Sequence, residues 1–194
     1  MLERTLHDPL VSEPNIRELH YFLKEIYLQC PLPEDIVFIC IGTDQSTGDS
    51  FGPLMGSQLQ SMGFPNVIGT LAYPCDADRV EHAVKQLQQQ SKLVVAIDAC
   101  LGSAKQVGTF ICTTGALKPG AALGKKLPPV GDYSIAAVVN AVGPKAYWKI
   151  QSTSLFTVMQ LVEELAKQVS KIWGMKKESA LYEPYISERQ LSNQ

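Results

Sequence analysis

The chain has 194 residues, of which 45% are hydrophobic and 19% are charged, as is typical of one globular domain with its own core. Its 17 Lys and Arg residues nearly balance its 19 Asp and Glu residues, so the net charge is −2. This balance argues against a basic field for nucleic acid and against the high net charge of a disordered chain. The five cysteines are an odd number and most lie in apolar runs, which favours reduced thiols in a cytoplasmic protein over a disulfide framework.

No segment of the sequence predicts secretion or a membrane contact. The first residues lack the apolar stretch of a secretory signal, and the longest apolar runs are far shorter than the ~20 residues of a membrane span. We divide the chain into an N-terminal helical extension (1–34), an α/β domain (35–174) and a polar C-terminal tail (175–194).

Helix and strand patterns alternate along the chain. An N-terminal helix is expected from a cap at Ser12 to the prolines Pro31 and Pro33. We expect strands over 36–41, 66–72, 93–98, 107–113 and 134–141, and helices over 53–62, 79–90 and 152–173. Gly108 and nearby threonines indicate an edge position for the fourth strand. The alternation predicts a three-layer αβα domain with a mostly parallel sheet, in which ligands bind beyond the carboxyl ends of the strands.

Two segments lie at such strand ends, the Gly-, Ser- and Asp-rich loop 42–52 and Asp98, the last residue of the third predicted strand. A phosphate-binding loop is disfavoured because five residues separate Gly42 from Gly48 and an acid, Asp49, replaces the lysine of that motif. A serine esterase would use Ser50 as nucleophile, but none of the three histidines has the spacing of its base.

The remaining interpretation pairs Asp49 with Asp98. A carboxyl group at the end of an apolar strand is partly desolvated, and a second carboxyl group nearby would let the two share a proton. One could then activate water while the other, protonated, polarises a carbonyl group. The plain alternative is that each aspartate only caps a helix or a turn. Cys100, two residues beyond Asp98, could act as a nucleophile, but a small buried thiol is the simpler interpretation.

Three segments carry a resemblance to a known family, Ile41 to Pro53, Ile97 to Gly102 and Val130 to Ile135. They resemble the YyaC family of sporulation proteins from spore-forming Firmicutes, which is similar in turn to the spore germination protease. The germination protease has a Thr-x-Asp-x-x-Gly-Pro segment and an Ile-Asp-Ala segment, and its catalytic aspartates would correspond to Asp49 and Asp98. The resemblance thus implies a peptidase whose substrate is a protein or peptide, among them spore proteins, with loop amides as oxyanion donors. We expect substrate contacts at Gly42, Thr43, Asp44, Thr47, Gly48, Ser50 and Asp132, with a turn role as the alternative for Asp44 and for Asp132.

The hydrogenase maturation endopeptidases are more distant relatives in this resemblance, with the same α/β fold, also called phosphorylase/hydrolase-like. They bind nickel through a Glu, an Asp and a His, of which Asp49 and Asp98 would match the first two. No histidine of this chain falls at the third position, so no metal or other cofactor is expected, although two carboxylates can hold a hard cation weakly.

The sequence therefore predicts a sporulation-associated, aspartate-dependent peptidase in the cytoplasm of the forespore or mother cell. It predicts no nucleic-acid or membrane partner, and a homo-oligomer is compatible with it. The alternative is a non-catalytic spore-assembly protein that keeps the protease fold, because fold alone does not determine function.

Overall fold

The computed structural model describes residues 15–89, 91–120 and 127–175, so the predicted cap at Ser12 and nearly all of the C-terminal tail lie outside the described residues. The described residues form a five-stranded sheet in the order β2-β1-β3-β5-β4. All neighbouring strands are parallel except β4, which pairs antiparallel with β5 at the edge. The strands are β1 (Ile36–Cys40), β2 (Val67–Ile68), β3 (Leu93–Gly102), β4 (Phe110–Thr114) and β5 (Tyr133–Ala141). The predicted mostly parallel sheet and the edge position of the fourth strand are confirmed.

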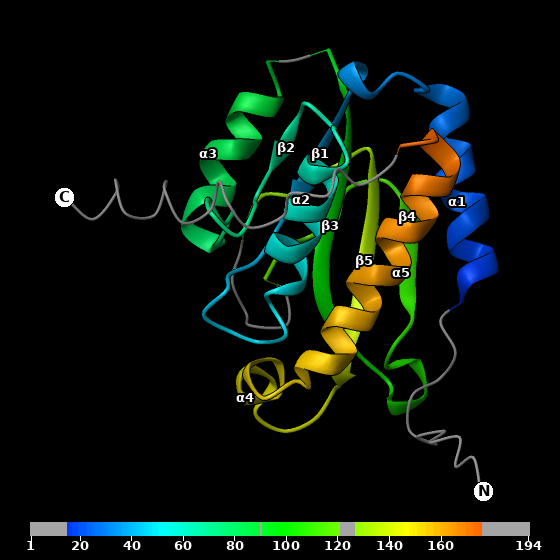
Figure 1. Ribbon diagram of the computed structural model, residues 1–194. Helices are drawn as coiled ribbons and strands as arrows, with labels where there is room; N and C mark the ends of the chain where they lie inside the picture. The colour runs from blue at the N-terminus through cyan, green and yellow to red at the C-terminus, as the bar shows by residue number, and fades with distance from the viewer. Residues whose placement is uncertain (1–14, 90, 121–126, 176–194) are drawn as a thin grey trace, which may run out of the picture.

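Helices cover both faces of the sheet and make the three predicted layers (Figure 1). The helices are α1 (Ile16–Gln29), α2 (Phe51–Ser61), α3 (Ala77–Leu87), α4 (Ala146–Gln151) and α5 (Leu155–Trp173). Buried residues of α1, α2 and α5 share one core with side chains such as Phe38 and Ile97 of the sheet. On the opposite face, buried residues of α3 pack with Ile39 and Ala96, joined by Val130 from the long loop before β5.

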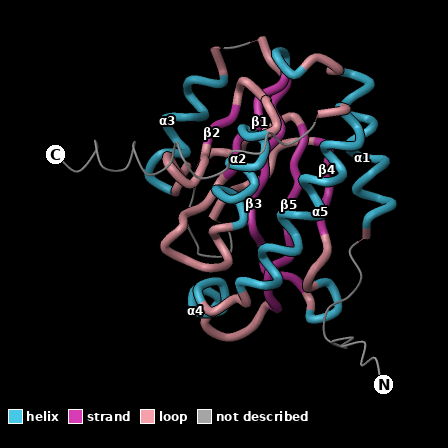
Figure 2. The backbone as a smooth tube through the Cα atoms, in the orientation of Figure 1, coloured by secondary structure: helices cyan, strands magenta, loops and turns pink. Residues whose placement is uncertain are grey.

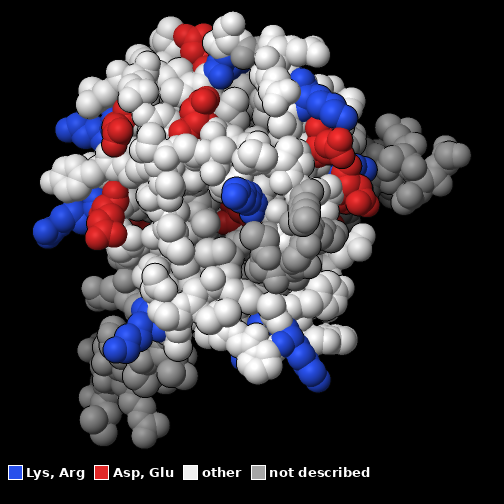
Figure 3. Space-filling view, turned by 180° about the vertical axis from the view of Figure 1, so that it is seen from behind, with Lys and Arg blue, Asp and Glu red and all other residues white. Residues whose placement is uncertain are grey.

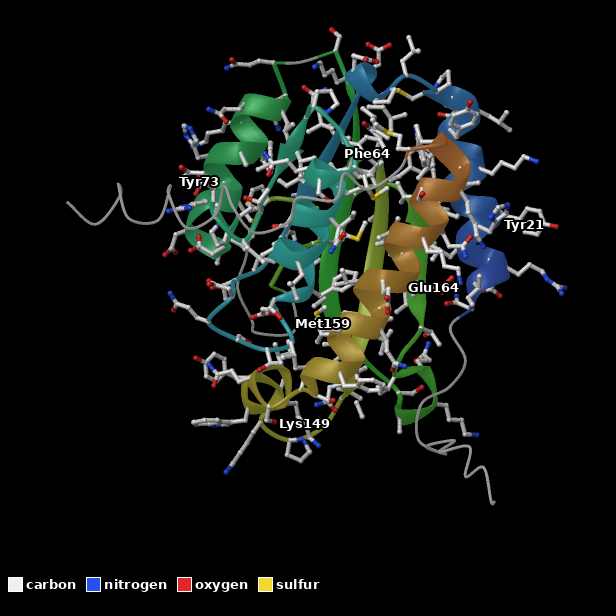
Figure 4. All side chains as sticks on the ribbon, viewed as in Figure 1. Tyr21, Phe64, Tyr73, Lys149, Met159 and Glu164 are labelled. Carbon is white, nitrogen blue, oxygen red and sulfur yellow. The ribbon has the colours of Figure 1, made fainter. Side chains whose placement is uncertain are left out.

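The N-terminal helix packs into the main core. Leu19, Leu23 and Ile26 recur at helical spacing and are fully buried. At its start the side chain of Asn15 donates a hydrogen bond to the carbonyl oxygen of Phe110 (2.9 Å) and accepts one from the amide of the same residue (2.8 Å). These bonds tie the helix to the edge strand β4, while Tyr21 points away into solvent (Figure 4).

Three element boundaries differ from the predictions. The second strand is only Val67–Ile68. The third strand does not end at Asp98 but continues to Gly102, because β5 pairs with it over that whole length. The predicted helix over 152–173 begins slightly later, as α5, where Ser154 caps it by accepting a hydrogen bond from the amide of Thr157 (3.5 Å). The short helix α4 lies before it, outside the predicted range, and was not predicted.

The surface carries charges of both signs. Figure 3 shows lysine, arginine, aspartate and glutamate side chains interspersed on the face seen from behind, with wide uncharged areas between them. Of the helices in residues 15–89, 91–120 and 127–175, none combines the length and apolar character that crossing a bilayer requires.

Candidate functional site

The sheet reverses its direction of growth between β1 and β3. From β1 the chain crosses through α2 to β2 on one side, and from β2 it crosses through α3 to β3 on the other side of β1. The two crossover helices therefore lie on opposite faces of the sheet (Figure 1), and the reversal lies at the carboxyl end of β1 beside the middle of β3. Such a reversal is where open α/β sheets bind their ligands.

Two glycines bring the loop after β1 close to the end of that strand. A Cβ atom at Gly42 would lie 2.1 Å from the carbonyl oxygen of Asp49, and the φ of +142° at Gly42 is itself rarely adopted by other residues. A Cβ atom at Gly52 would lie 1.9 Å from the carbonyl oxygen of Ile41. The absence of both side chains allows the loop to fold back and places Asp49 beside the strand end.

Helix α4 closes the same end of the sheet and is fixed to this loop (Figure 2). The amide of Gly48 donates to the carbonyl oxygen of Ile150 at 2.9 Å, and the side chain of Asn140 donates to that of Lys149 at 2.9 Å. The loop that carries Asp49 is thus held by β1 on one side and by α4 on the other.

These elements enclose an open cleft of about 720 Å³. Its walls come from the loop after β1, the start of α3, the middle of β3, the long loop before β5 and the start of α4. The lining residues are Ile41, Gly42, Thr43, Gln45, Ser46, Asp49, Asp76, Ala77, Asp78, Asp98, Gly120, Leu127, Lys145, Ala146, Tyr147 and Gln151. Asp49 and Asp98, predicted as a pair, both line it.

Asp98 lies on the α3 face of β3, in line with Ala96. Burial, with a smaller contribution from the nearby charge of Asp49, raises the pKa of the Asp98 carboxyl group to about 8. A hydrogen bond from the amide of Ala99 to Asp98 Oδ1 (2.8 Å) lowers the pKa of Asp98 without offsetting the burial. At neutral pH the carboxyl group of Asp98 is therefore mostly protonated. Asp98 is nevertheless only partly buried and lines the cleft.

Of the residues predicted to contact substrate, Gly42 and Thr43 line the cleft, whereas Thr47, Gly48 and Ser50 do not. Ser50 is 7% exposed and its hydroxyl group donates to the carbonyl oxygen of Thr47 at 2.6 Å, so it serves the turn that starts α2. This geometry argues against Ser50 as an esterase nucleophile. Its hydroxyl group donates its proton to a backbone carbonyl group and not to a catalytic base, and the residue lies outside the cleft.

The loop amides differ from the expected oxyanion donors. Gly42 donates to the carbonyl oxygen of Cys75 (3.0 Å), Gly48 to that of Ile150 and Ser50 to that of Ser46 (2.9 Å). An amide that already donates a hydrogen bond to a carbonyl group of the protein is not available to stabilise a developing oxyanion.

Asp132 and Asp44 also lie outside the cleft lining. Asp132 sits before β5, at the amino ends of the strands, where its carboxyl group accepts a hydrogen bond from the amide of Val94 (2.8 Å) and its own amide donates to the carbonyl oxygen of Val94 (2.8 Å). It therefore joins the starts of β3 and β5, the turn role that the sequence left open. Asp44 is an exposed turn residue.

Most of the cleft residues were not predicted as site residues, among them Asp76, Ser46, Lys145 and Tyr147. Asp76 caps α3, where its carboxyl group accepts hydrogen bonds from the amides of Asp78 and Arg79 (both 3.2 Å). Ser46, Lys145 and Tyr147 come from a loop and from a short helix that carried no motif. Lys145 has a left-handed backbone, with φ 60° and ψ 54°, the only positive φ of a non-glycine residue in the described chain.

The donor set does not fit a three-ligand nickel site. In the described parts of the chain, no three His, Cys, Asp or Glu side chains are grouped so that they could hold a metal ion. His20 lies on α1, where its ring is within hydrogen-bond distance of Gln168 of α5 (3.2 Å), and His82 lies on α3. The cleft therefore offers the carboxyl groups of Asp49 and Asp98 as its candidate acid and base.

The cysteines are free thiols. Cys75 is buried against the end of β1. Burial, together with the nearby Asp98, raises the pKa of Cys100 to about 12, so Cys100 is not a thiolate at neutral pH.

The described chain has the α/β fold of the hydrogenase maturation proteases. The solved structure of the [NiFe] hydrogenase maturation protease HycI from Thermococcus kodakarensis KOD1 superposes with a TM-score of 0.56, covering 78% of this chain and 98% of that one at 21% identity. This likeness shows the fold alone.

The chain belongs to the family described as "Protein of unknown function (DUF1256)", which matches residues 10–171. It is 44% identical over 139 residues to the "Uncharacterized protein YyaC" of Bacillus subtilis (strain 168), covering 70% of this chain and 68% of that protein. The resemblance to the YyaC family is thereby confirmed.

Proposed function

We propose that the protein is a peptidase that hydrolyses peptide bonds with Asp49 and Asp98. The observation that carries the proposal is that two carboxyl groups from different elements line one cleft at the reversal point of the sheet, and that one of them is protonated at neutral pH. The resemblance of their segments to those around the catalytic aspartates of the germination protease adds support.

The different environments of the two groups assign their roles. Asp49, as carboxylate, accepts a proton from water as the water oxygen attacks the scissile carbonyl carbon. Asp98, as carboxylic acid, donates a hydrogen bond to the carbonyl oxygen and stabilises the charge that develops there. The proton on Asp49 then passes to the leaving amine as the C–N bond breaks, which restores both groups.

The test is hydrolysis of an unstructured protein such as casein, with cleavage sites read by mass spectrometry. Asp49→Asn and Asp98→Asn should each reduce the rate by at least about 10²-fold while the circular dichroism spectrum is retained. Asp35→Asn is the matched control, because Asp35 is exposed just before β1, at the opposite end of the sheet. Wild-type rates in both cleft variants would overturn the proposal.

A second candidate is a non-catalytic binding protein that retains the protease fold. This candidate is favoured by the loop amides of Gly42, Gly48 and Ser50. These amides donate hydrogen bonds to carbonyl groups of the protein, so fewer donors remain for an oxyanion. A purified protein that binds a partner through the cleft but never cleaves it, with or without added divalent metal, would support this candidate over the peptidase.

We also propose a role in sporulation, in the cytoplasm of the forespore or mother cell, with spore proteins among the substrates. The family resemblance supports this, together with the absence of a bilayer-spanning helix among the described residues. Deletion of the gene in a spore-forming host, with spore yield and germination as readouts, tests the role, and unchanged spores would contradict it.

A further inference from the structure

Acidic side chains are in excess in the walls of the cleft. Beyond Asp49 and Asp98, the start of α3 contributes Asp76 and Asp78. Among the described lining residues the one basic side chain is Lys145, because Arg79 lies outside the lining and donates to the carbonyl oxygen of Pro74 (3.1 Å). A cleft lined mainly by one sign of charge concentrates ligands of the opposite sign.

The two acids of α3 retain capacity for a ligand. Asp76 uses Oδ1 to cap the helix, and no hydrogen bond to its Oδ2 occurs among the described residues. Asp78 is exposed, and in the described residues neither acid forms an ion pair, the pairs there being Lys85–Glu81 and Lys167–Glu164.

A separate observation in the same cleft points to a polar ligand. Ser46 is 6% exposed, and its hydroxyl group has no hydrogen-bond partner within the described structure. A buried hydroxyl group without a partner is uncommon and unfavourable, so such a group calls for an explanation. A peptide group entering the cleft beside Ser46 would supply the missing partner, because each peptide unit carries both a donor and an acceptor.

An aromatic ring completes this part of the wall. Tyr147 is exposed at the start of α4, its hydroxyl group accepts a hydrogen bond from Gln151 (2.7 Å), and its ring packs edge-on against Trp148 at a centroid distance of 6.0 Å. Aromatic rings attract cationic groups at close range, which adds to the attraction of the acids.

We propose that the cleft selects a peptide segment with a cationic side chain, lysine or arginine, which Asp76 and Asp78 bind beside Tyr147 while Ser46 bonds the peptide backbone. The inference rests on the proposed function in one respect, that this cleft is the substrate site. It goes beyond that function by stating which side chain the substrate presents.

Binding is measured by amide chemical shifts on titration with tetralysine, with tetraglutamine as the uncharged probe. The Asp98→Asn form is used, because asparagine resembles the protonated acid and prevents turnover. Tetralysine should shift the amides of Thr43, Ala77 and Tyr147, and tetraglutamine should bind several-fold more weakly. The double change Asp76→Asn/Asp78→Asn should weaken tetralysine binding about three- to tenfold, and the fold should survive because asparagine caps a helix as well as aspartate does.

The control is Asp35→Asn, which makes the same chemical change at the other end of the sheet and should leave the affinity unaltered. The inference is overturned by equal binding of the two probes, by shifts located outside the cleft, by no shifts at all, or by an equal effect of Asp35→Asn. Its failure is distinguishable from that of the peptidase. Hydrolysis without a preference for cationic segments removes only this inference, whereas tetralysine binding by a protein that never hydrolyses peptides removes only the peptidase.

Discussion

Asp49 and Asp98 reach the same cleft from opposite sides of the switch between β1 and β3, and the charge of Asp49 adds to the burial that keeps Asp98 protonated. Gly42 is what allows Asp49 to lie there, because its missing side chain leaves room for the carbonyl group of Asp49. The fold therefore gives Asp98 a protonation state at neutral pH that an exposed aspartate does not have.

The first prediction concerns the pH dependence of hydrolysis. Asp98 must be protonated to act as the acid, and its pKa is raised to about 8, so kcat/KM should fall as the pH rises through that value. Steady-state rates on one peptide over a pH series measure this descending limb. Activity that continues to rise well above the pKa of Asp98 would show that Asp98 is not the acid.

The second prediction concerns stability. The folded state raises the pKa of Asp98 from 3.8 to about 8, so between these values it binds more protons than the unfolded chain. The contribution of Asp98 to stability is therefore fully present below the lower value and is lost as the pH rises through the upper one. The free energy of unfolding of Asp98→Asn minus that of the wild type should increase over this range by about 1 kcal/mol or more.

Urea unfolding at a series of pH values measures that difference, and Asp35→Asn controls for the loss of one carboxyl group from an exposed position. A difference that does not change with pH would mean that Asp98 is not held protonated by the fold.

The sheet could be predicted because its signals are local. The apolar runs of β1 and β3 identify buried strands, and Gly108 with its threonines identifies the edge. The end of β3 was misplaced because an acid within an apolar run resembles a strand end, while the pairing of β3 with β5 beyond Asp98 depends on residues distant in sequence. The short helix α4 was missed because six residues are too few to show a helical repeat of apolar residues.

The candidate site was predictable only in part, for a related reason. Asp49 and Asp98 follow or occupy recognisable strands, so topology alone brings them together. Asp132 lies at the amino ends of β3 and β5, a position that its motif match does not reveal. Ser46, Lys145 and Tyr147 enter the cleft only after α4 docks on the loop through Gly48, a contact without a sequence signature.

The third prediction tests how Asp49 is positioned. Gly42→Ala places a methyl group 2.1 Å from the carbonyl oxygen of Asp49 and should destabilise the protein by about 3 kcal/mol or more, with loss of hydrolysis. Gly115→Ala is the matched control, because its φ is also positive (+115°) but its Cβ would meet nothing within 4 Å. Thermal unfolding should show a clearly larger loss for Gly42→Ala. Equal losses would attribute the effect to backbone strain alone.

The fourth prediction separates a structural from a ligand-binding role of Ser46. Because its hydroxyl group has no partner in the described structure, Ser46→Ala should leave the free energy of unfolding unchanged or raise it by up to about 1 kcal/mol. The same change should weaken peptide binding several-fold. Ser57→Ala is the control, since its buried hydroxyl donates to the carbonyl oxygen of Pro53 (2.9 Å) and should cost about 1 kcal/mol. A comparable loss at Ser46 would reveal a structural hydrogen bond.

The fifth prediction concerns the strained backbone at Lys145. A lysine with φ 60° is disfavoured by about 1 kcal/mol, because its Cβ approaches the following carbonyl oxygen, a contact that glycine avoids. Lys145→Gly should therefore stabilise the protein by up to about 1 kcal/mol. Lys149→Gly, in the same short helix, should destabilise it by about 1 kcal/mol, because glycine is a poor residue within a helix.

The two Lys→Gly variants remove the same charge and differ only in the backbone that they replace. Lys149 is exposed on α4 and is seen at the lower end of the molecule in Figure 4, so its side chain contributes little packing. Opposite signs in their unfolding free energies would confirm that Lys145 holds a strained conformation. Strain retained at a cleft residue is typical of positions where a side chain is directed toward a ligand. Losses of the same sign and size in both variants would instead mean that the left-handed conformation at Lys145 carries no strain.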